Sequence, residues 1–319
     1  MLNSFVYSVN VILPVFLLVV LGVALKRAGW IGEGFSRDAD KLVFRFGLPA
    51  MLFLDAASAG GADALDPGLL LFVFVAVSGS FAAVTLVVCL AVRDNGKRGA
   101  MIQGICRSNF AILGVPLIEN MFGDGGVSLV SFVIPVTIIL FNVYSVIVLS
   151  VFSPREKKQP ASQTFRAVCR NIVTNPLIIA VILGIPFLCF PVTVPLVIER
   201  TAGYLSDMTT ALALISLGST FRRESFRGRV GYALTSALSK TVLLPAVTVT
   251  AAALLGMRGA PLGIVLVLFG APTAVSSYIM AKNMNSDHEL AGQILLLTTL
   301  FCLFTVFLGV FVLRSLCLI

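Results

Sequence analysis

The sequence predicts an all-α integral membrane protein with ten transmembrane helices, arranged as two inverted five-helix repeats in which helices 4 and 9 are broken. Three observations support this fold class: an apolar composition, ten apolar stretches of membrane length, and interrupted stretches at equivalent positions of the two halves. Of the 319 residues, 58% are hydrophobic and 12% are charged. Soluble domains carry about 25% charged residues, so we expect lipid to be the main solvent of this chain.

Backbone amides in lipid must be bonded within the protein, which leaves helices or closed barrels. The apolar stretches run for about 20 residues, as a spanning helix requires, rather than alternating in short strands. No basic residue precedes the first stretch and no cleavage site follows it, which favours a retained span over a signal peptide. We therefore predict spans at residues 5–25, 38–59, 67–92, 98–121, 127–152, 171–190, 193–221, 230–255, 261–282 and 290–313.

The lysines and arginines orient these spans. Of 23 such residues, 17 lie in the loops after spans 1, 3, 5, 7 and 9, and three lie on the opposite side. Because cytoplasmic loops are enriched in basic residues, this asymmetry predicts a multi-pass protein of the cell (inner or plasma) membrane with both termini on the non-cytoplasmic side. The net charge of +8 follows from this topology, so we expect no nucleic-acid partner.

A polar segment divides the spans five and five. It contains the basic stretch SPREKKQPASQTFR, and we interpret residues 153–170 as a cytoplasmic linker between a first repeat at 1–152 and a second at 171–319. An odd number of spans in each half forces the two halves to insert in opposite orientations. This arrangement is typical of secondary transporters with a binding site near the middle of the membrane.

Spans 4 and 9 carry the interruptions. A shift of 163 residues aligns SNFAILGVPLIENMFGD, which begins at Ser108, with the second half of span 9, and pairs Asn109 with Pro272. Glycine and proline inside a span free backbone groups that only protein or a water-filled cavity can satisfy. Paired interruptions therefore indicate a binding site, although glycine and proline also kink membrane helices without any function.

A broken helix exposes a new N-terminus, which attracts anions such as a carboxylate. Hydrogen-bonding side chains lie close to both interruptions. As candidate substrate contacts we assign Ser108, Asn109, Ser276, Ser277 and Tyr278.

The stretches NFAILGVPLIENMFGD in span 4 and APTAVSSYIMAKNMN in span 9 resemble the auxin efflux carrier family, which includes plant auxin carriers and bacterial transporters of dicarboxylates. FGLPAMLF, TNPLIIAVILG, ALALISLGSTF and KTVLLPAV, in spans 2, 6, 7 and 8, support the resemblance, which covers nearly the whole chain. Ser108 stands where plant members have proline before the asparagine, and the central loop is short. The serine predicts a milder break in span 4, and both departures favour the bacterial branch.

The resemblance implies that the broken spans 4 and 9 cross, with Asn109 and Pro272 at the crossing and Pro116 following it. It also implies a scaffold of spans 1, 2, 6 and 7 and a moving transport domain of spans 3–5 and 8–10. The substrate would lie between these two parts.

Polar side chains within spans are functional candidates because lipid makes them costly. Lys240 in span 8 would pair with a substrate carboxylate or control conformation, unless it only bonds carbonyls freed at the breaks. Arg107 in span 4 either draws anions toward the crossing or extends to the cytoplasmic face. Asn142 in span 5 either bonds between helices or contacts substrate. No acid stands clearly at the middle of the membrane, where ion coupling usually places one.

These patterns predict an alternating-access carrier for small organic anions such as malate or malonate. An auxin or indole-acid exporter and a dicarboxylate symporter coupled to H⁺ or Na⁺ stay open, and an anion channel is the alternative of a different class. The lone His288 and the six cysteines lack the spacing of a catalytic or metal site, so we predict no enzyme, metal or cofactor. The expected partners are the small anion and the lipid bilayer, and a homodimer is left open.

Overall fold

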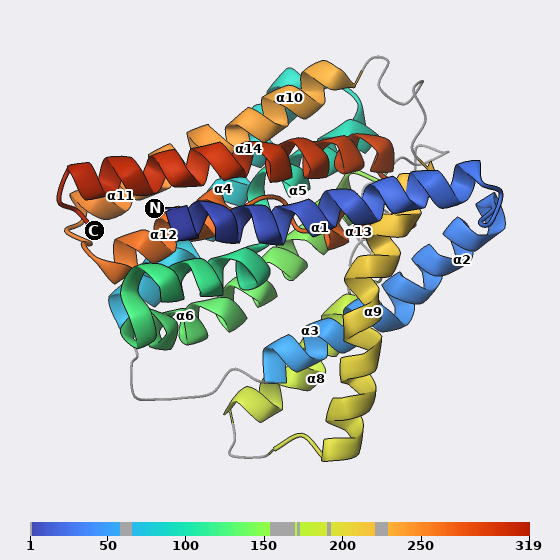
Figure 1. Ribbon diagram of the computed structural model, residues 1–319, viewed down its shortest axis with the longest axis horizontal. Helices are drawn as coiled ribbons and strands as arrows, with labels where there is room; N and C mark the ends of the chain where they lie inside the picture. Colours follow the sequence, from blue (N-terminus) through green and yellow to red (C-terminus); the bar gives the residue numbers. More distant parts are fainter. Residues whose placement is uncertain (1, 58–65, 154–169, 171–172, 190–192, 221–228) are drawn as a thin grey trace.

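Helices form every regular element in the described part of the chain, as the sequence predicts. The computed structural model describes residues 2–57, 66–153, 170, 173–189, 193–220 and 229–319 (Figure 1). In the first half the elements are α1 (Leu2–Arg27), α2 (Glu33–Leu42), a π-helical segment (Val43–Gly47), α3 (Leu48–Ala57), α4 (Pro67–Ala91), α5 (Asn95–Cys106) and α6 (Phe110–Val151).

In the second half they are α8 (Pro176–Cys189), α9 (Leu196–Thr220), α10 (Val230–Leu238), a π-helical segment (Ser239–Leu243), α11 (Leu244–Leu254), α12 (Ala260–Gly270), α13 (Ser276–Asn283) and α14 (His288–Ser315). The predicted linker at 153–170 lies almost entirely outside the described residues.

Among the described residues, four helical stretches are long and apolar enough to cross a membrane: Pro67–Ala91, Phe132–Val151, Val230–Leu254 and His288–Ser315. Two shorter apolar helices cover Pro176–Phe187 and Ala260–Gly270. Several membrane-length helices are thus present, while the count of ten stays a prediction. The predicted spans 98–121 and 261–282 are each divided between two helices, so neither meets the length criterion.

Both stretches that the sequence predicts to be interrupted are broken. The first break separates α5 from α6 by three residues, and the second separates α12 from α13 by five. Arg107 and Ala271, the first residue of each break, adopt extended backbone conformations, with ψ angles of 137° and 152°. The shorter first break agrees with the milder interruption expected from Ser108.

The chain reverses direction after each break. Inside α6 the turn is at Gly123, where φ is +64° and ψ is −155°. Glycine suits this position because it has no Cβ to clash in the positive-φ region. Before α14 the turn includes Asn285, with φ of +57°, which asparagine tolerates better than most residues.

Aspartate side chains cap the N-termini of several helices. The Asp66 carboxylate accepts a hydrogen bond from the Leu69 amide at 3.0 Å, and Pro67 occupies the first helical position of α4, where its missing N–H costs nothing. Asp94 and Asp287 cap α5 and α14 in the same way. These caps fix where the helices start.

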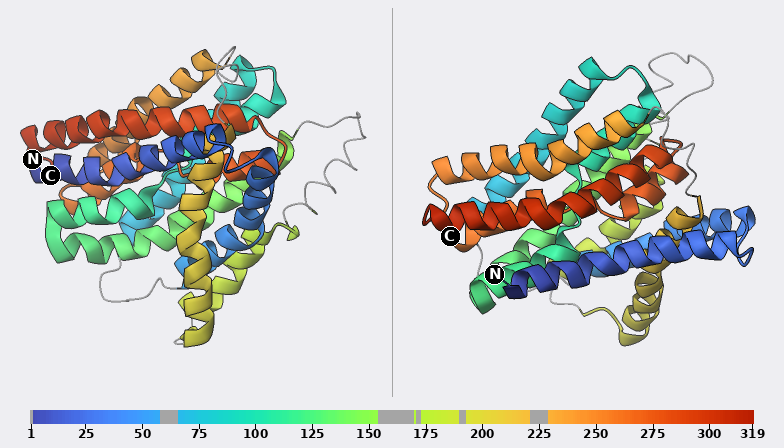
Figure 2. Two further views of the ribbon diagram at one scale, coloured as in Figure 1. Left: turned by 45° about the vertical axis from the view of Figure 1, so that its right-hand side comes forward. Right: turned by 45° about the horizontal axis from the view of Figure 1, so that its top comes forward.

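The helices pack in two groups that meet along one interface (Figures 1 and 2). The α9 group contains α1, α2, α3, α8 and α9, and the α14 group contains α4, α5, α6 and α10 to α14. One apolar cluster, which includes Leu69, Ile102 and Phe269, lies within the α14 group. A second cluster joins Leu52 and Leu214 of the α9 group to Ile279 of α13, so it lies between the groups.

The start of α1 and the end of the chain lie at the same end of the molecule in all views (Figures 1 and 2). The connection between α1 and α2 lies at the other end. This arrangement is the one expected for an even number of passes.

Two glycines allow α1 and α9 to cross closely. A Cβ at Gly22 would overlap the Ile215 carbonyl oxygen, and a Cβ at Gly218 would overlap the Val19 carbonyl oxygen. Both obstacles are backbone atoms, so they cannot rotate away. Small residues at such crossings let membrane helices approach closely.

We expect Gly218→Ala to lower the melting temperature of the detergent-purified protein by several degrees, because overpacking costs about 1–3 kcal/mol. Gly79→Ala in α4 is the matched control, since nothing lies within 4 Å of its added Cβ. A thermal unfolding series would contradict the packing argument if both variants melted together.

Candidate functional site

A cavity of about 60 Å³ lies between the α9 group and the two breaks. Its walls come from α3, α6 and α9 and from the non-helical residues that follow α5 and α12. Leu48, Leu52, Phe141 and Ala213 make much of the lining apolar. The polar lining consists of Asp55, Arg107, Ser108, Asn109, Thr137, Asn142, Thr209, Thr210 and Ser276.

The two breaks cross at the edge of this cavity. The Asn109 amide donates to the Pro272 carbonyl oxygen at 2.8 Å. Beside them, the Thr273 hydroxyl donates to the Gly104 carbonyl, and the Thr273 amide donates to the Thr298 hydroxyl at 3.2 Å. These three bonds show that each break, with its neighbours, supplies partners for polar groups that lie at the other break.

Arg107 is the charged group at the centre of the site. The residue is only 5% exposed, and its guanidinium donates to Asn142 Oδ1 at 2.9 Å and to Ser276 Oγ at 2.8 Å, while it also contacts Met280 Sδ. No carboxylate of the described residues pairs with it. Of the two alternatives that the sequence left open, the structure therefore shows Arg107 at the crossing rather than extended to the cytoplasmic face.

Two helix N-termini begin at the same cavity. α6 starts at Phe110 and α13 starts at Ser276, and both residues line it. Neither helix has an acidic residue in its first turn. A helix N-terminus carries a partial positive charge of roughly +0.5, so the two starts add to the charge of Arg107.

Two further polar residues line the cavity, Ser108 and Asn109. The Ser108 hydroxyl is buried and has no hydrogen-bond partner in the described part of the chain. The Asn109 side chain makes no capping bond to α6. Asn142 bonds Arg107 between helices, the first of the two roles that the sequence allowed, and it also lines the cavity, while contact with a substrate stays a prediction.

Asp55 is a polar residue that the sequence reading did not assign to the site. It lies in α3 and lines the cavity together with Arg107. Because Asp55 is near one end of the predicted span 38–59, the sequence suggested that it lies at the membrane surface. Its spacing of one helical turn from Met51 and two from Leu48, which also line the cavity, is the signal that would have placed it there.

The structure does not bring every predicted site residue to the cavity. Pro272 contributes its carbonyl to the crossing, and Pro116 lies in α6 with a side chain outside the described part. Ser277 and Tyr278 are buried but do not line the cavity, because each step along a helix turns about 100° away from Ser276.

Lys240 also lies away from the cavity. It is fully buried in the π-helical segment before α11, and this segment packs against α5, α12 and α14. Its ammonium has no hydrogen-bond partner among the described residues. This position favours a role inside the α14 group over direct contact with a substrate, and that role stays a prediction. No group of three or more His, Cys, Asp and Glu side chains in the described chain forms a metal site.

Comparison with known proteins identifies the family of this chain. A family model described as a membrane transport protein matches residues 7–310. An uncharacterized transporter of Methanothermobacter thermautotrophicus is 24% identical over 94% of this chain and 96% of its own length, and one of Methanocaldococcus jannaschii is 22% identical over 93% and 96%. A probable auxin efflux carrier component of Oryza sativa is 27% identical over 37% of this chain and 21% of its own length. The chain is therefore a multi-pass membrane protein that belongs to the membrane transport protein family, the family of the auxin efflux carriers.

Proposed function

We propose that this transporter carries small organic anions, carboxylates above all, by alternating access, with the substrate held in the cavity at the crossing. The observation that carries the proposal is Arg107, a buried cation held by neutral partners and open to the cavity. An unpaired buried charge is unfavourable, so the site is suited to a ligand that brings the missing negative charge.

The shift of 163 residues supports two inverted repeats at 1–152 and 171–319. Asn109 bonds to Pro272, the residue aligned with it, and Gly123 aligns with the turn that follows Asn285. If each span of the first half corresponds to the span five positions later, the α1–α9 pair corresponds to the α8–α3 pair. Both pairs are in contact.

Alternating access needs two parts that can move against each other around the site. The α9 group matches the expected scaffold and the α14 group the expected transport domain, with the cavity and an apolar cluster between them. The cavity of about 60 Å³ is small beside ligand pockets of about 300–1,000 Å³. We therefore propose that it widens when the groups separate.

The lining favours a small organic anion that presents both carboxylate and apolar surface. Among the described residues, Arg107 is the one basic side chain in the lining, and Leu52, Phe141 and Ala213 supply apolar surface. Malate, malonate and an indole acid remain candidates, and an auxin or indole-acid exporter is the alternative within this family. The basic loops assign the linker side to the cytoplasm and both termini to the outside of the cell membrane.

The first test is transport by the purified protein in liposomes. Labelled malonate, malate and indole-3-acetate would be offered under a membrane potential of each sign, with and without proton or sodium gradients. We expect saturable uptake of a carboxylate, favoured by an inside-positive potential by roughly 2.3 kcal/mol per charge per 100 mV. With the membrane potential held at zero, unlabelled anion inside the vesicles should still accelerate uptake, which a channel would not produce. Absence of saturable flux for all carboxylates would refute the proposal.

We expect Arg107→Gln to weaken the apparent affinity for the transported anion by about tenfold or more, since a charge-assisted hydrogen bond contributes about 1.5–3 kcal/mol. Arg258→Gln is the matched control, because the exposed Arg258 bonds the Ala253 and Met257 carbonyls and is not among the cavity-lining residues. Concentration dependence of uptake measures the effect. Unchanged affinity in Arg107→Gln would remove this arginine from the site.

A proton-coupled symporter is a second candidate, and the position of Asp55 in the cavity favours it. A carboxylate substrate and an ionised Asp55 would repel each other, so binding would favour the protonated acid. We then expect an inward proton gradient to stimulate uptake by the parent protein. Asp55→Asn should abolish the stimulation and keep anion exchange, whereas Asp207→Asn, at an exposed position of α9, should keep both. A parent protein insensitive to both proton and sodium gradients would instead indicate a uniporter.

A further inference from the structure

An ion pair joins the α9 group to the α14 group outside the cavity. Lys282 lies near the end of α13, and its ammonium pairs with the carboxylate of Asp40 in α2. The Asp40 side chain is 3% exposed and the Lys282 side chain 21%. Any separation of the two groups at this place must therefore break a contact between two largely buried charges.

Asp40 is fixed to its own group by hydroxyl groups. Ser216 of α9 donates a hydrogen bond to Asp40 Oδ1 at 2.5 Å. Nearby, the hydroxyls of Ser36 and Ser219 bond to each other at 2.6 Å. These contacts join α2 to α9, so Asp40 moves with the α9 group.

Lys282 is fixed to the other group. Its ammonium also donates to the Tyr278 hydroxyl at 3.3 Å, and it lies 5.6 Å from the centre of that ring. The Tyr278 ring in turn lies 6.1 Å from the ring of His288, which begins α14. Lys282 therefore moves with α13 and α14.

The pair lies on one side of the cavity only. Lys282 follows Ser276, a lining residue, by six positions, or about 9 Å of helix. Asp40 precedes Leu48, another lining residue, by eight positions, or about 12 Å. Asp40 is close to the loop after α1 and Lys282 is close to the turn after α13, so both lie toward the basic loops.

We propose that Asp40 and Lys282 form the cytoplasmic gate of this carrier. Their contact holds the two groups together on the side of the basic loops, and it breaks when the cavity opens to that side. The inference rests on the alternating-access function proposed above and on the orientation given by the basic loops.

The energetics of buried charges give this pair two favoured arrangements. An unpaired charge that stays buried is strongly unfavourable, so the pair is either intact or broken with both partners hydrated. Only separation of the groups admits the water that the second arrangement needs. Removing one partner takes away the stabilisation of the closed arrangement and shifts the population toward the open one.

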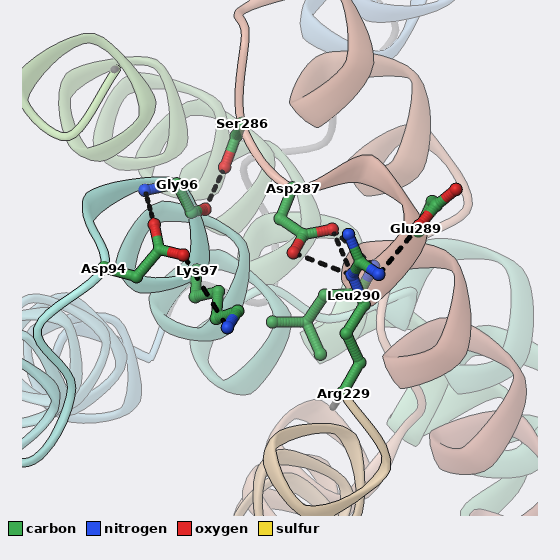
Figure 3. Close-up of polar contacts among 8 residues, drawn as sticks. All are labelled: Asp94, Gly96, Lys97, Arg229, Ser286, Asp287, Glu289 and Leu290. Carbon is green, nitrogen blue, oxygen red and sulfur yellow. Dashed lines mark hydrogen bonds and ion pairs between the residues drawn. The ribbon is translucent and has the colours of Figure 1, made fainter. Parts of the chain in front are cut away.

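A second ionic cluster supplies a control on the same side of the molecule. Arg229, at the start of α10, pairs with Asp287 at 2.9 Å and with Glu289 at 3.0 Å (Figure 3). All three residues belong to the α14 group, and Ser286 beside them bonds the Gly96 carbonyl of the same group at 2.7 Å. These contacts stay within one group when the groups separate.

The test is the accessibility of a cysteine placed in the cavity. Ala213→Cys would be introduced into a protein whose six native cysteines are replaced by alanine, and a membrane-impermeant maleimide would be added on the cytoplasmic face. We expect Asp40→Asn and Lys282→Gln each to raise the labelling rate by about tenfold or more, with Arg229→Gln within about twofold of the parent, as a shift in a two-state population predicts. Each labelling rate is divided by the rate for the same thiol in denaturant.

Equal rates for the parent and for both gate variants would overturn the gate, as would equal acceleration by Arg229→Gln. The double exchange Asp40→Lys with Lys282→Asp should restore slow labelling, which a merely loosened protein would not show. Labelling requires no substrate. Acceleration in a protein that moves no anion would therefore refute the proposed substrate and leave the gate standing, whereas anion transport with unaltered labelling would refute the gate alone.

Discussion

The hydrogen bond between the Asn109 amide and the Pro272 carbonyl is the constraint on which the site depends. Each break frees backbone groups at a depth where lipid offers no partner, and leaving them unpaired would cost several kcal/mol each. The bond runs one way, because proline has no N–H to return to Asn109. Thr273 compensates by bonding Gly104 and Thr298. The breaks therefore stabilise each other, and the crossing fixes where the cavity forms.

The same crossing concentrates positive charge. α6 and α13 both start at the cavity, and Arg107 is the first residue of the non-helical break between α5 and α6. Asn142 and Ser276 hold the guanidinium through neutral oxygens, so they orient it without neutralising it. An arginine paired with a carboxylate would be equally well placed and would have little attraction left for an anion. The break thus positions the charge of Arg107, and the neutral partners Asn142 and Ser276 leave that charge available to an anion.

Sequence reasoning predicted features that depend on position along the chain. Glycine and proline within spans 4 and 9 predicted that these spans are interrupted, the alignment of the two spans and the family resemblance predicted where, and apolar length predicted helices. It could not supply the direction in which a side chain points. Ser276 faces the cavity while Ser277 and Tyr278, one and two residues later, do not, and Arg107 was left with two alternatives. The sequence did not predict a role for Asp40, because its partner Lys282 is on another span and pairing between distant spans leaves no local pattern.

The interface between the groups combines two kinds of contact with different responses to separation. The apolar cluster that includes Leu52, Leu214 and Ile279 can repack at shifted positions, since dispersion contacts carry no fixed direction. The Asp40–Lys282 pair cannot slide in this way, because ionic hydrogen bonds depend strongly on distance and angle. An interface of the first kind alone would permit a continuum of positions. Adding one directional contact at its edge favours discrete ones, which an alternating-access carrier needs if its cavity is not to open to both sides at once.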